Sequence, residues 1–296
     1  MRSPRDWDSA EHESDDVACG RSQEGAVTSV AIVVPLSAQP SLTSDEELSI
    51  RHLQHFLGQY DKYFIAPKGM SFNRPGFETM VFPRKYFGSA LAHARLQFSD
   101  EFYSRFAGYK YILMHHLDAL VLSDQLSKWC QSDLDFIGPP WLQSDDSPWV
   151  RHARVGNSGF ALMKIEGFLN VLRSERRGVD PDEFWREFCA VNPPYRQWIH
   201  RPRKYLKRMH VFNNVRWETR WWCYRKDGTG NGDYFWSDHA VRYWPQFKIA
   251  SVEQGLEFAF EVAPRLCFEL NNRRLPFGSH AWARYDRSFW EPYLLQ

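Results

Sequence analysis

The feature that most constrains this chain is an apolar run interrupted by one carboxylate, from Tyr111 to Leu122. A strand covered on both faces has an almost unbroken apolar sequence, so the run predicts a buried strand. Asp118 interrupts it, and a buried carboxylate is costly unless a cation or several donors face it. Ligands bind at the carboxyl ends of strands in open α/β sheets. Asp118 therefore either faces a ligand or caps the following turn.

Strand and helix patterns alternate around this run. A strand is predicted over residues 30–34 and ends at Pro35, which cannot donate to a strand ladder. Ser44 and Glu47 have the spacing of a capping box for the next helix, and a second strand follows over residues 63–66. The order strand, helix, strand predicts an α/β domain with a mostly parallel central sheet flanked by helices.

Further helices and strands are expected along the rest of the chain. Helices are expected near residues 100–106, after a cap at Ser123, after residue 163 and after a capping box of Ser251 with Gln254; strands are expected at residues 135–137 and 160–163. Residues 28–296 are expected to form one domain. Residues 1–27 are polar and acidic, with too little apolar sequence to fold, and we expect a disordered tail.

The composition indicates a reducing compartment. The five cysteines are odd in number and share no metal-type spacing. No window approaches 18 apolar residues, and the N-terminus lacks the apolar core of a signal peptide. We therefore expect a cytoplasmic protein. A net charge of +1 argues against a dedicated nucleic-acid binder.

Residues 194–226 depart from the α/β pattern and are interpreted as a basic aromatic insertion. Ten cations alternate there with aromatic residues: Arg196, Arg201, Arg203, Lys204, Lys207, Arg208, Arg216, Arg220, Arg225 and Lys226, among Tyr195, Trp198, Tyr205, Trp217, Trp221 and Trp222. This mixture suits a phosphate-bearing or anionic partner: nucleic acid, a membrane face or a charged glycan. The alternative is a solvated helical face whose aromatic side chains turn inward.

Several short motifs occur in an order that resembles one protein family over about residues 29–285. They include Val33-Val-Pro-Leu36, Leu117-Asp118-Ala-Leu-Val121, Asp135-Phe-Ile-Gly138-Pro-Pro-Trp141, Val155-Gly-Asn-Ser-Gly159-Phe160, Asp233-Tyr-Phe-Trp236, Phe258-Ala-Phe-Glu261 and Pro276-Phe-Gly-Ser-His280-Ala-Trp282. In this order they resemble the DUF5672 family, a group of proposed glycosyltransferases with a GT-A-like fold. The resemblance implies an enzyme that takes a sugar from a nucleotide-sugar donor.

The resemblance also implies a divalent metal. The donor leaves as a diphosphate, whose charge Mg²⁺ or Mn²⁺ neutralises. GT-A enzymes hold this ion with the last acid of an Asp-x-Asp motif; here His116-Leu-Asp118 occupies the place. Asp118 is then the metal ligand, and His116 contacts the donor. His280 is the second candidate ligand, because neutral imidazole binds Mn²⁺; the alternative is a structural histidine.

A catalytic base is expected where inverting GT-A enzymes carry a Glu-Asp pair. Asp233 stands there, preceded by Gly232 in place of the glutamate. It would remove the proton of the acceptor hydroxyl, although a helix N-cap is the structural alternative. Glu261, at the end of an apolar run, is the second candidate base.

The remaining site residues follow from the same motifs. The donor is expected to contact Pro35, Leu36, Gly156, Asn157, Ser158 and Gly159 together with His116 and Asp118; the acceptor is expected to contact Trp141, Arg201, Arg203 and Lys204. Trp141 would stack on a sugar or pack in the core. The predicted function is an inverting, metal-assisted glycosyltransferase acting on a glycan or lipid-linked saccharide, with peripheral contact to an anionic membrane. The alternative is a non-catalytic glycan- or nucleic-acid-binding protein on a decayed transferase scaffold.

Overall fold

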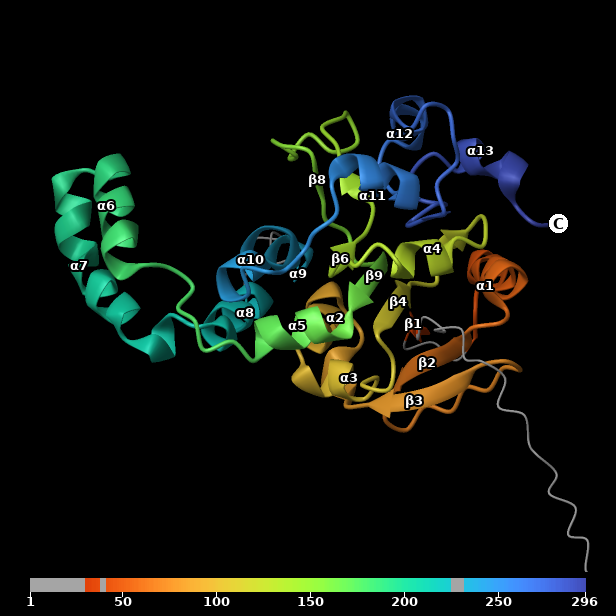
Figure 1. The fold of residues 1–296 in the computed structure, drawn as a ribbon, viewed down its shortest axis with the longest axis horizontal. Coiled ribbons are helices and arrows are strands. Elements are labelled where there is room, and N and C mark those ends of the chain that lie inside the picture. The colour runs from red at the N-terminus through yellow and green to blue at the C-terminus, as the bar shows by residue number, and fades with distance from the viewer. Residues whose placement is uncertain (1–29, 38–40, 225–231) are drawn as a thin grey trace, which may run out of the picture.

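A computed structural model describes residues 30–37, 41–224 and 232–296 (Figure 1). The predicted tail at residues 1–27 lies outside the described residues. Among the helices that the structure describes, none is both long and apolar enough to cross a bilayer.

A six-stranded sheet forms the centre, in the order β3-β2-β1-β4-β9-β6. Its strands are β1 (Val30–Pro35), β2 (Asp61–Pro67), β3 (Glu78–Phe82), β4 (Tyr111–His115), β6 (Phe136–Ile137) and β9 (Phe160–Lys164). The pairs β1–β2, β1–β4 and β2–β3 are parallel, and β9 runs antiparallel to β4 and β6. The predicted α/β class with a mostly parallel central sheet is confirmed.

Helices flank this sheet, as predicted (Figure 1). They are α1 (Ser44–Leu57), α2 (Ala90–Gln97), α3 (Asp100–Ser104), α4 (Leu126–Cys130), α5 (Ile165–Leu172), α6 (Pro181–Val191), α7 (Pro194–Arg208), α8 (Val215–Tyr224), α9 (Gly232–Tyr234), α10 (Ala240–Tyr243), α11 (Val252–Phe258), α12 (Pro264–Leu270) and α13 (Arg287–Trp290). Shorter elements are the 3₁₀-helices η1 (Arg84–Tyr86), η2 (His210–Phe212) and η4 (Glu291–Tyr293) and the π-helix η3 (Phe235–His239). Helix α1 buries Ile50 and Leu53, and α5 buries Phe168 against Trp236 at 4.2 Å between ring centroids.

The apolar run that begins at Tyr111 supplies two strands rather than one. Every residue of β4 is buried, and the chain then turns, with the amide of Ala119 donating to the carbonyl of His116 at 3.0 Å. It re-enters the core as β5 (Leu120–Val121), which belongs to a second, three-stranded sheet with β11 (Gly278–Ser279) and β10 (Ala259–Phe260). A third sheet pairs β7 (Pro140–Trp141) with β8 (Arg154–Val155). Asp118 therefore lies in the turn between two sheets.

Some local predictions need correction. The capping box of α1 is formed by Thr43 and Glu46, one residue before the predicted pair. Helix α4 begins at Leu126 without a side-chain cap from Ser123. Strand β3 was not predicted, because it is an edge strand whose residues are mostly exposed and lack an apolar run. The capping box of Ser251 with Gln254 is confirmed.

Helices α6 and α7 form a hairpin that projects from the main body (Figure 1); we call it the arm. The side chain of Gln197 fastens the two helices, donating to the carbonyls of Cys189 at 3.0 Å and Asn192 at 2.7 Å. Helix α8 returns to the body, where Trp222 joins the core. The described part of the predicted basic aromatic segment is thus divided between the arm and a helix packed on the body, and its last residues, Arg225 and Lys226, lie outside the described residues.

Candidate active site

A pocket of about 800 Å³ opens where the central sheet meets the second sheet. His116, which follows β4, lines it together with Ser158 and Gly159, which precede β9. Its other walls come from α2, α9 and the segments after β10 and β11: His93, Gln97, Asp233, Tyr234, Glu261, His280, Arg284 and Tyr285. The pocket lies at the carboxyl end of a central parallel strand, where α/β sheets bind ligands.

The second sheet brings three titratable side chains together from distant parts of the chain. Strand β11 pairs parallel with β10 and antiparallel with β5. Glu261 follows β10, His280 follows β11, and Asp118 lies just before β5. Because β5 runs in the opposite direction, all three residues are at the same end of this sheet.

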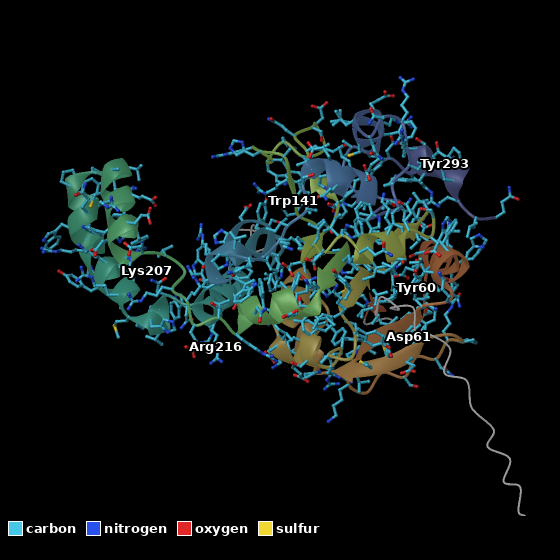
Figure 2. The ribbon with its side chains drawn as sticks, viewed as in Figure 1. Tyr60, Asp61, Trp141, Lys207, Arg216 and Tyr293 are labelled. Carbon is cyan, nitrogen blue, oxygen red and sulfur yellow. The ribbon has the colours of Figure 1, made fainter. Side chains whose placement is uncertain are left out.

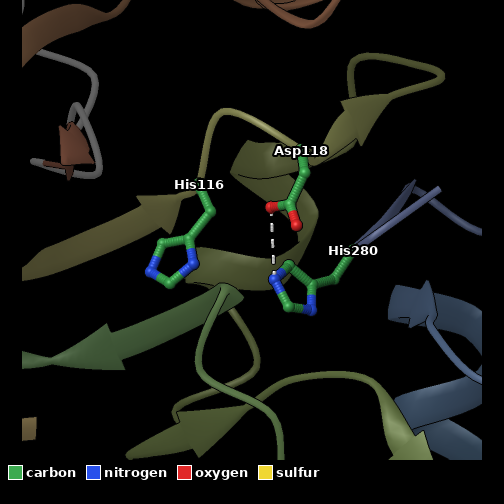
Figure 3. A group of neighbouring side chains, drawn as sticks. All are labelled: His116, Asp118 and His280. Atoms are coloured by element: carbon green, nitrogen blue, oxygen red, sulfur yellow. Dashed lines mark ion pairs between the residues drawn. The ribbon is translucent and has the colours of Figure 1, made fainter. Parts of the chain in front are cut away.

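His280 lies between the carboxylates of Asp118 and Glu261, and Figure 3 shows the side toward Asp118. Its Nε2 is 3.4 Å from Oδ1 of Asp118, and its Nδ1 is 3.0 Å from Oε1 of Glu261. Burial lowers the pKa of His280, but the hydrogen bonds and charges of Asp118 and Glu261 outweigh it and raise the pKa to about 10. Burial raises the pKa of Asp118, and the hydrogen bond and charge of His280 reverse this and lower it well below its usual range. In the absence of a metal, the cluster holds an imidazolium between carboxylates.

Glu261 is the centre of a buried hydrogen-bond network. Its Oε1 accepts from Nδ2 of Asn157 at 2.7 Å, and its Oε2 accepts from Nε1 of Trp141 at 3.2 Å. With His280, three donors therefore surround a carboxylate that is almost fully buried. Such a carboxylate is well placed to orient the imidazole of His280.

The glycines of the motif at residues 156–159 allow side chains to lie directly against the backbone. A Cβ on Gly156 would come within 2.4 Å of the Trp141 ring, and one on Gly159 within 2.1 Å of Nε2 of His280. Between them, Oδ1 of Asn157 accepts from the amide of Gly159 at 2.6 Å. This short loop positions the ring that covers the network and the imidazole at its centre.

His116, Asp118 and His280 make up a cluster that fits a divalent metal. One ligand atom from each lies within 4.8 Å of the others (Figure 3). Metal-ligating histidines commonly donate their second ring N–H to a carboxylate, and Glu261 takes this position behind Nδ1 of His280 while Nε2 faces Asp118. Two imidazoles and a carboxylate suit Mn²⁺, and occupation by a metal requires Nε2 of His280 to lose its proton.

Asp233 also lines the pocket. It is buried on α9 and accepts a hydrogen bond from Oγ of Ser158, which also accepts one from Nε2 of Gln97 at 2.8 Å. His93, one turn before Gln97 on α2, lies 3.0 Å from His116, measured between their Nε2 atoms. Burial and the charge of His280 lower the pKa of His93 to about 4, so this ring is neutral at physiological pH.

The sequence did not identify His93, Gln97, Arg284 and Tyr285 as pocket residues. The spacing of His93 and Gln97 by four residues is a helical signal, but the helix itself was not predicted. Arg284 lies beside the predicted His280 motif, and its exposed guanidinium is at the pocket wall.

The structure places other predicted site residues away from the pocket wall. Leu36 is in the core after β1, where its amide donates to Ile65 at 2.9 Å, and neither it nor Pro35 lines the pocket. Asp118 and Gly156 do not line the pocket themselves. Asp118 contacts His280 and Gly156 lies against the ring of Trp141, and both of these partners line it. Trp141 lines it but is 5% exposed, its indole donating to Glu261. The donor and acceptor roles of these residues stay predictions.

The predicted acceptor cations lie on the arm. Arg201, Arg203 and Lys204 belong to α7, and Lys204 pairs with Asp182 of α6 at 3.1 Å. Figure 2 shows Lys207 of the same helix well separated from Trp141 in the main body. An acceptor that contacts both regions would have to be extended, and the acceptor role of these cations stays a prediction.

Two solved structures with similarity to this chain are of the glycosyltransferase GlyE from Streptococcus pneumoniae TIGR4. One, of the apo form, has 12% sequence identity and a TM-score of 0.42; the other has 10% identity and a TM-score of 0.44. The alignments cover 91% of this chain and 61% of each GlyE chain. A comparison with curated proteins finds no match.

The comparison with protein families gives a match over about two thirds of the chain. Residues 76–280 match the sequence model of a family described as "Protein of unknown function (DUF5672)". The matched segment includes the turn with Asp118, the loop at residues 156–159, Asp233, Glu261 and His280, which are the residues that form the pocket and its metal-type cluster. This chain is therefore a member of the DUF5672 family.

Proposed function

We propose that this protein is a metal-dependent glycosyltransferase that moves a sugar from a nucleotide-sugar donor to the hydroxyl of a glycan or lipid-linked acceptor. The observation that carries the proposal is the cluster of His116, Asp118 and His280 beside a pocket of about 800 Å³ that Asp233 also lines. A metal-type site and a carboxylate facing one cavity are the two parts that an inverting transfer needs.

The donor diphosphate belongs at the end of the pocket formed by the cluster. Asp118 and His280 would hold Mn²⁺ or Mg²⁺ with His116 as the third residue, and Glu261 would fix the ring of His280 through Nδ1. A metal held by these residues would supply positive charge next to the departing diphosphate. Arg284 adds a permanent positive charge at the wall beside His280.

The acceptor hydroxyl belongs near Asp233. In an inverting transfer the hydroxyl oxygen forms a bond to the anomeric carbon as the bond to the diphosphate oxygen breaks, and the hydroxyl proton passes to the base. Asp233 lies on the pocket wall with Ser158 directed at one of its carboxylate oxygens, which holds the side chain in place. The three donors around Glu261, His280 among them, fit a positioning role for this carboxylate. We assign the base to Asp233 from its place in the pocket.

The direct test is donor turnover. The full chain is incubated with a panel of uridine, guanosine and cytidine sugar nucleotides, with Mn²⁺ or with a chelator, and release of free nucleotide is measured. We expect metal-dependent release with one donor class. Mn²⁺ binding, measured separately by calorimetry, is expected for the wild type and should be lost in Asp118→Asn.

A matched control keeps this test specific. Asp124 is an exposed aspartate six residues further along, bound to Gln59 at 2.8 Å and outside the pocket wall. Asp124→Asn should bind Mn²⁺ and turn over donor like the wild type. Absence of nucleotide release across the panel, together with sugar binding in the same pocket, would instead support the non-catalytic binding protein.

A further inference from the structure

Helix α7 carries an apolar stripe that the fold leaves uncovered. Its exposed side chains recur at intervals of three and four residues, which places them on one face of the helix. Trp198 is 78% exposed, Tyr195 61% and Ile199 57%, and Tyr205 and Met209 are each about half exposed. Trp198, Tyr205 and Met209 also line a shallow groove with Leu206. The alternative interpretation of inward-turned aromatic residues is wrong for this helix.

The opposite face of α7 makes the contacts with α6 that hold the arm together. The half-buried residues of α7 are Gln197, His200, Lys204 and Lys207, again at intervals of three and four. Gln197 bonds to the end of α6, Lys204 pairs with Asp182, and the ring of His200 meets that of Phe188 at 5.5 Å between centroids. These contacts lie on the side of α7 away from the apolar stripe, which stays largely exposed.

Arginines border the stripe on both sides. By helical position, Arg201 falls on one flank and Arg196 and Arg203 on the other, and all three are exposed. Within the described part of the chain, none of these three has an ion-pair partner. Helix α7 has six cations and no acidic residue. A central stripe of Trp, Tyr and aliphatic side chains with flanking arginines is typical of helices that lie in a membrane interface.

We propose that the arm binds an anionic lipid surface, with α7 lying in the interface plane. The apolar stripe would enter the boundary between head groups and acyl chains, where Trp and Tyr are favoured, while the flanking guanidinium groups contact lipid phosphates. The arm projects from the body (Figure 1), and the stripe lies on the face of α7 opposite to its half-buried residues, so it is open to a flat surface. This inference does not depend on the catalytic activity proposed above.

A second copy of the chain is a less suitable occupant of the stripe. Two α7 helices packed through this face would bring the flanking arginines of each copy together without an acid on either helix. Juxtaposed like charges oppose such an interface. An anionic bilayer satisfies both the charge and the apolar character of the same face, which is why we favour it.

The experiment is co-sedimentation of the full chain with vesicles of phosphatidylcholine alone or mixed two to one with phosphatidylserine. We expect binding to the mixed vesicles that weakens as salt is added, and little binding to the neutral ones. Trp198→Ser with Ile199→Ser should lower partitioning at least about ten-fold. Arg201→Gln with Arg203→Gln should lower it about five-fold for each charge removed.

Two control variants carry equivalent changes on the main body. Arg51→Gln with Lys68→Gln removes two exposed cations, and Leu266→Ser with Leu270→Ser removes two exposed apolar side chains of α12; both should partition like the wild type. The proposal is overturned if mixed vesicles do not sediment the wild type, or if the arm variants bind as it does. It is equally overturned if the changes at Trp198 and Ile199 abolish self-association in ultracentrifugation but leave vesicle binding unchanged. Binding of RNA without binding of vesicles would also overturn it.

Discussion

The pocket and the arm are built from similar residue types, yet they arrange them in opposite ways. In the pocket, charged and aromatic side chains face one another: Glu261 accepts from Trp141, Asn157 and His280. On α7, the aromatic side chains face outward and three arginines border them. The difference teaches that composition alone does not distinguish a binding network from a docking face; what distinguishes them is whether the polar groups are already paired.

Substitutions in the buried pocket network and on the exposed arm should therefore have different effects. Removing one member of a buried network leaves its partners unsatisfied, which is costly. Exposed ion pairs contribute little, because water and salt screen them. Changes in the pocket should therefore alter chemistry and ligand binding strongly, whereas changes on the arm should leave the fold and the pocket unaffected.

The largest effect is expected for Asp118→Asn. The change removes the carboxylate charge of the proposed metal cluster, whose stabilisation of the leaving group is worth several kcal/mol, so turnover should fall by about 10³-fold or more. Because the Asp118 side chain is 54% exposed, the melting temperature should change little. Steady-state kinetics with and without Mn²⁺ measures the loss. Full activity, or an unfolded variant, would remove Asp118 from the ligand set.

Asp233→Asn tests the proposed catalytic base in the pocket. It keeps an oxygen for the hydrogen bond from Ser158 but removes the basicity, and loss of a general base typically costs about 10²–10⁴ in rate. Donor affinity and Mn²⁺ binding should be retained. Glu261→Gln is the matched variant, expected to weaken metal binding through His280. If Glu261→Gln abolished transfer with metal binding intact and Asp233→Asn did not, the base would be Glu261. A product that retained the anomeric configuration of the donor would argue against a base role for either residue.

Gly159→Ala tests whether the close approach of His280 matters. A Cβ at this position would lie 2.1 Å from Nε2 of His280, so the imidazole must move. Displacing a positioned ligand in this way typically lowers metal affinity by about 10–100-fold. Calorimetric titration with Mn²⁺ measures it. Gly108→Ala is the control, since a Cβ there meets nothing within 4 Å; equal affinities for both variants would show that the approach is not needed.

A smaller, pH-dependent effect is expected at His52, which supports the second sheet from α1. Its Nδ1 donates to the carbonyl of Val121 at 2.9 Å, and its Nε2 accepts from the amide of Leu295 at 2.9 Å. Burial lowers its pKa below the ordinary value of 6.5, although the bond to Val121 partly opposes this. The unfolded chain therefore binds the proton more readily, and stability falls as the pH drops through about 6.5.

Chemical denaturation from about pH 7 to about pH 5 measures this contribution. His52→Asn keeps an amide group toward Val121 but does not titrate, so its free energy of unfolding should decline less steeply with acid than that of the wild type. Parallel declines for the two proteins would mean that His52 keeps an ordinary pKa in the folded state.

The smallest effect is expected for Asp182→Asn on the arm. This change breaks the pairs of the exposed Asp182 with the half-buried Lys204 and the exposed Arg208, each at 3.1 Å. Exposed pairs of this kind contribute little, so thermal unfolding of the main body should be unchanged within error. A clear drop in the melting temperature of the body would show that the arm and the pocket region are coupled, contrary to the comparison drawn above.

Much of the fold was accessible from the sequence, because local patterns encode it. The unbroken apolar run at residues 111–115, the strand at residues 30–34 and the capping box at Ser251 all depend on residues a few positions apart. Edge strand β3 and helix α2 were missed, since the first is largely exposed and the second has a weak apolar face. Without α2, His93 and Gln97 had no predicted place in the site.

The sequence by itself determined that Asp118 interrupts a buried run and that residues 156–159 form a short loop able to approach other groups closely. Only the tertiary structure decided that His280 lies between Asp118 and Glu261. Strands of two residues each make this arrangement, and β5 pairs with β11 across more than 100 residues of sequence. Such short pairings carry no periodic signal, and the packing of the whole chain sets them. The sequence also did not determine that Trp198 faces outward, because the pattern of an amphipathic helix specifies which residues share a face but not what that face contacts.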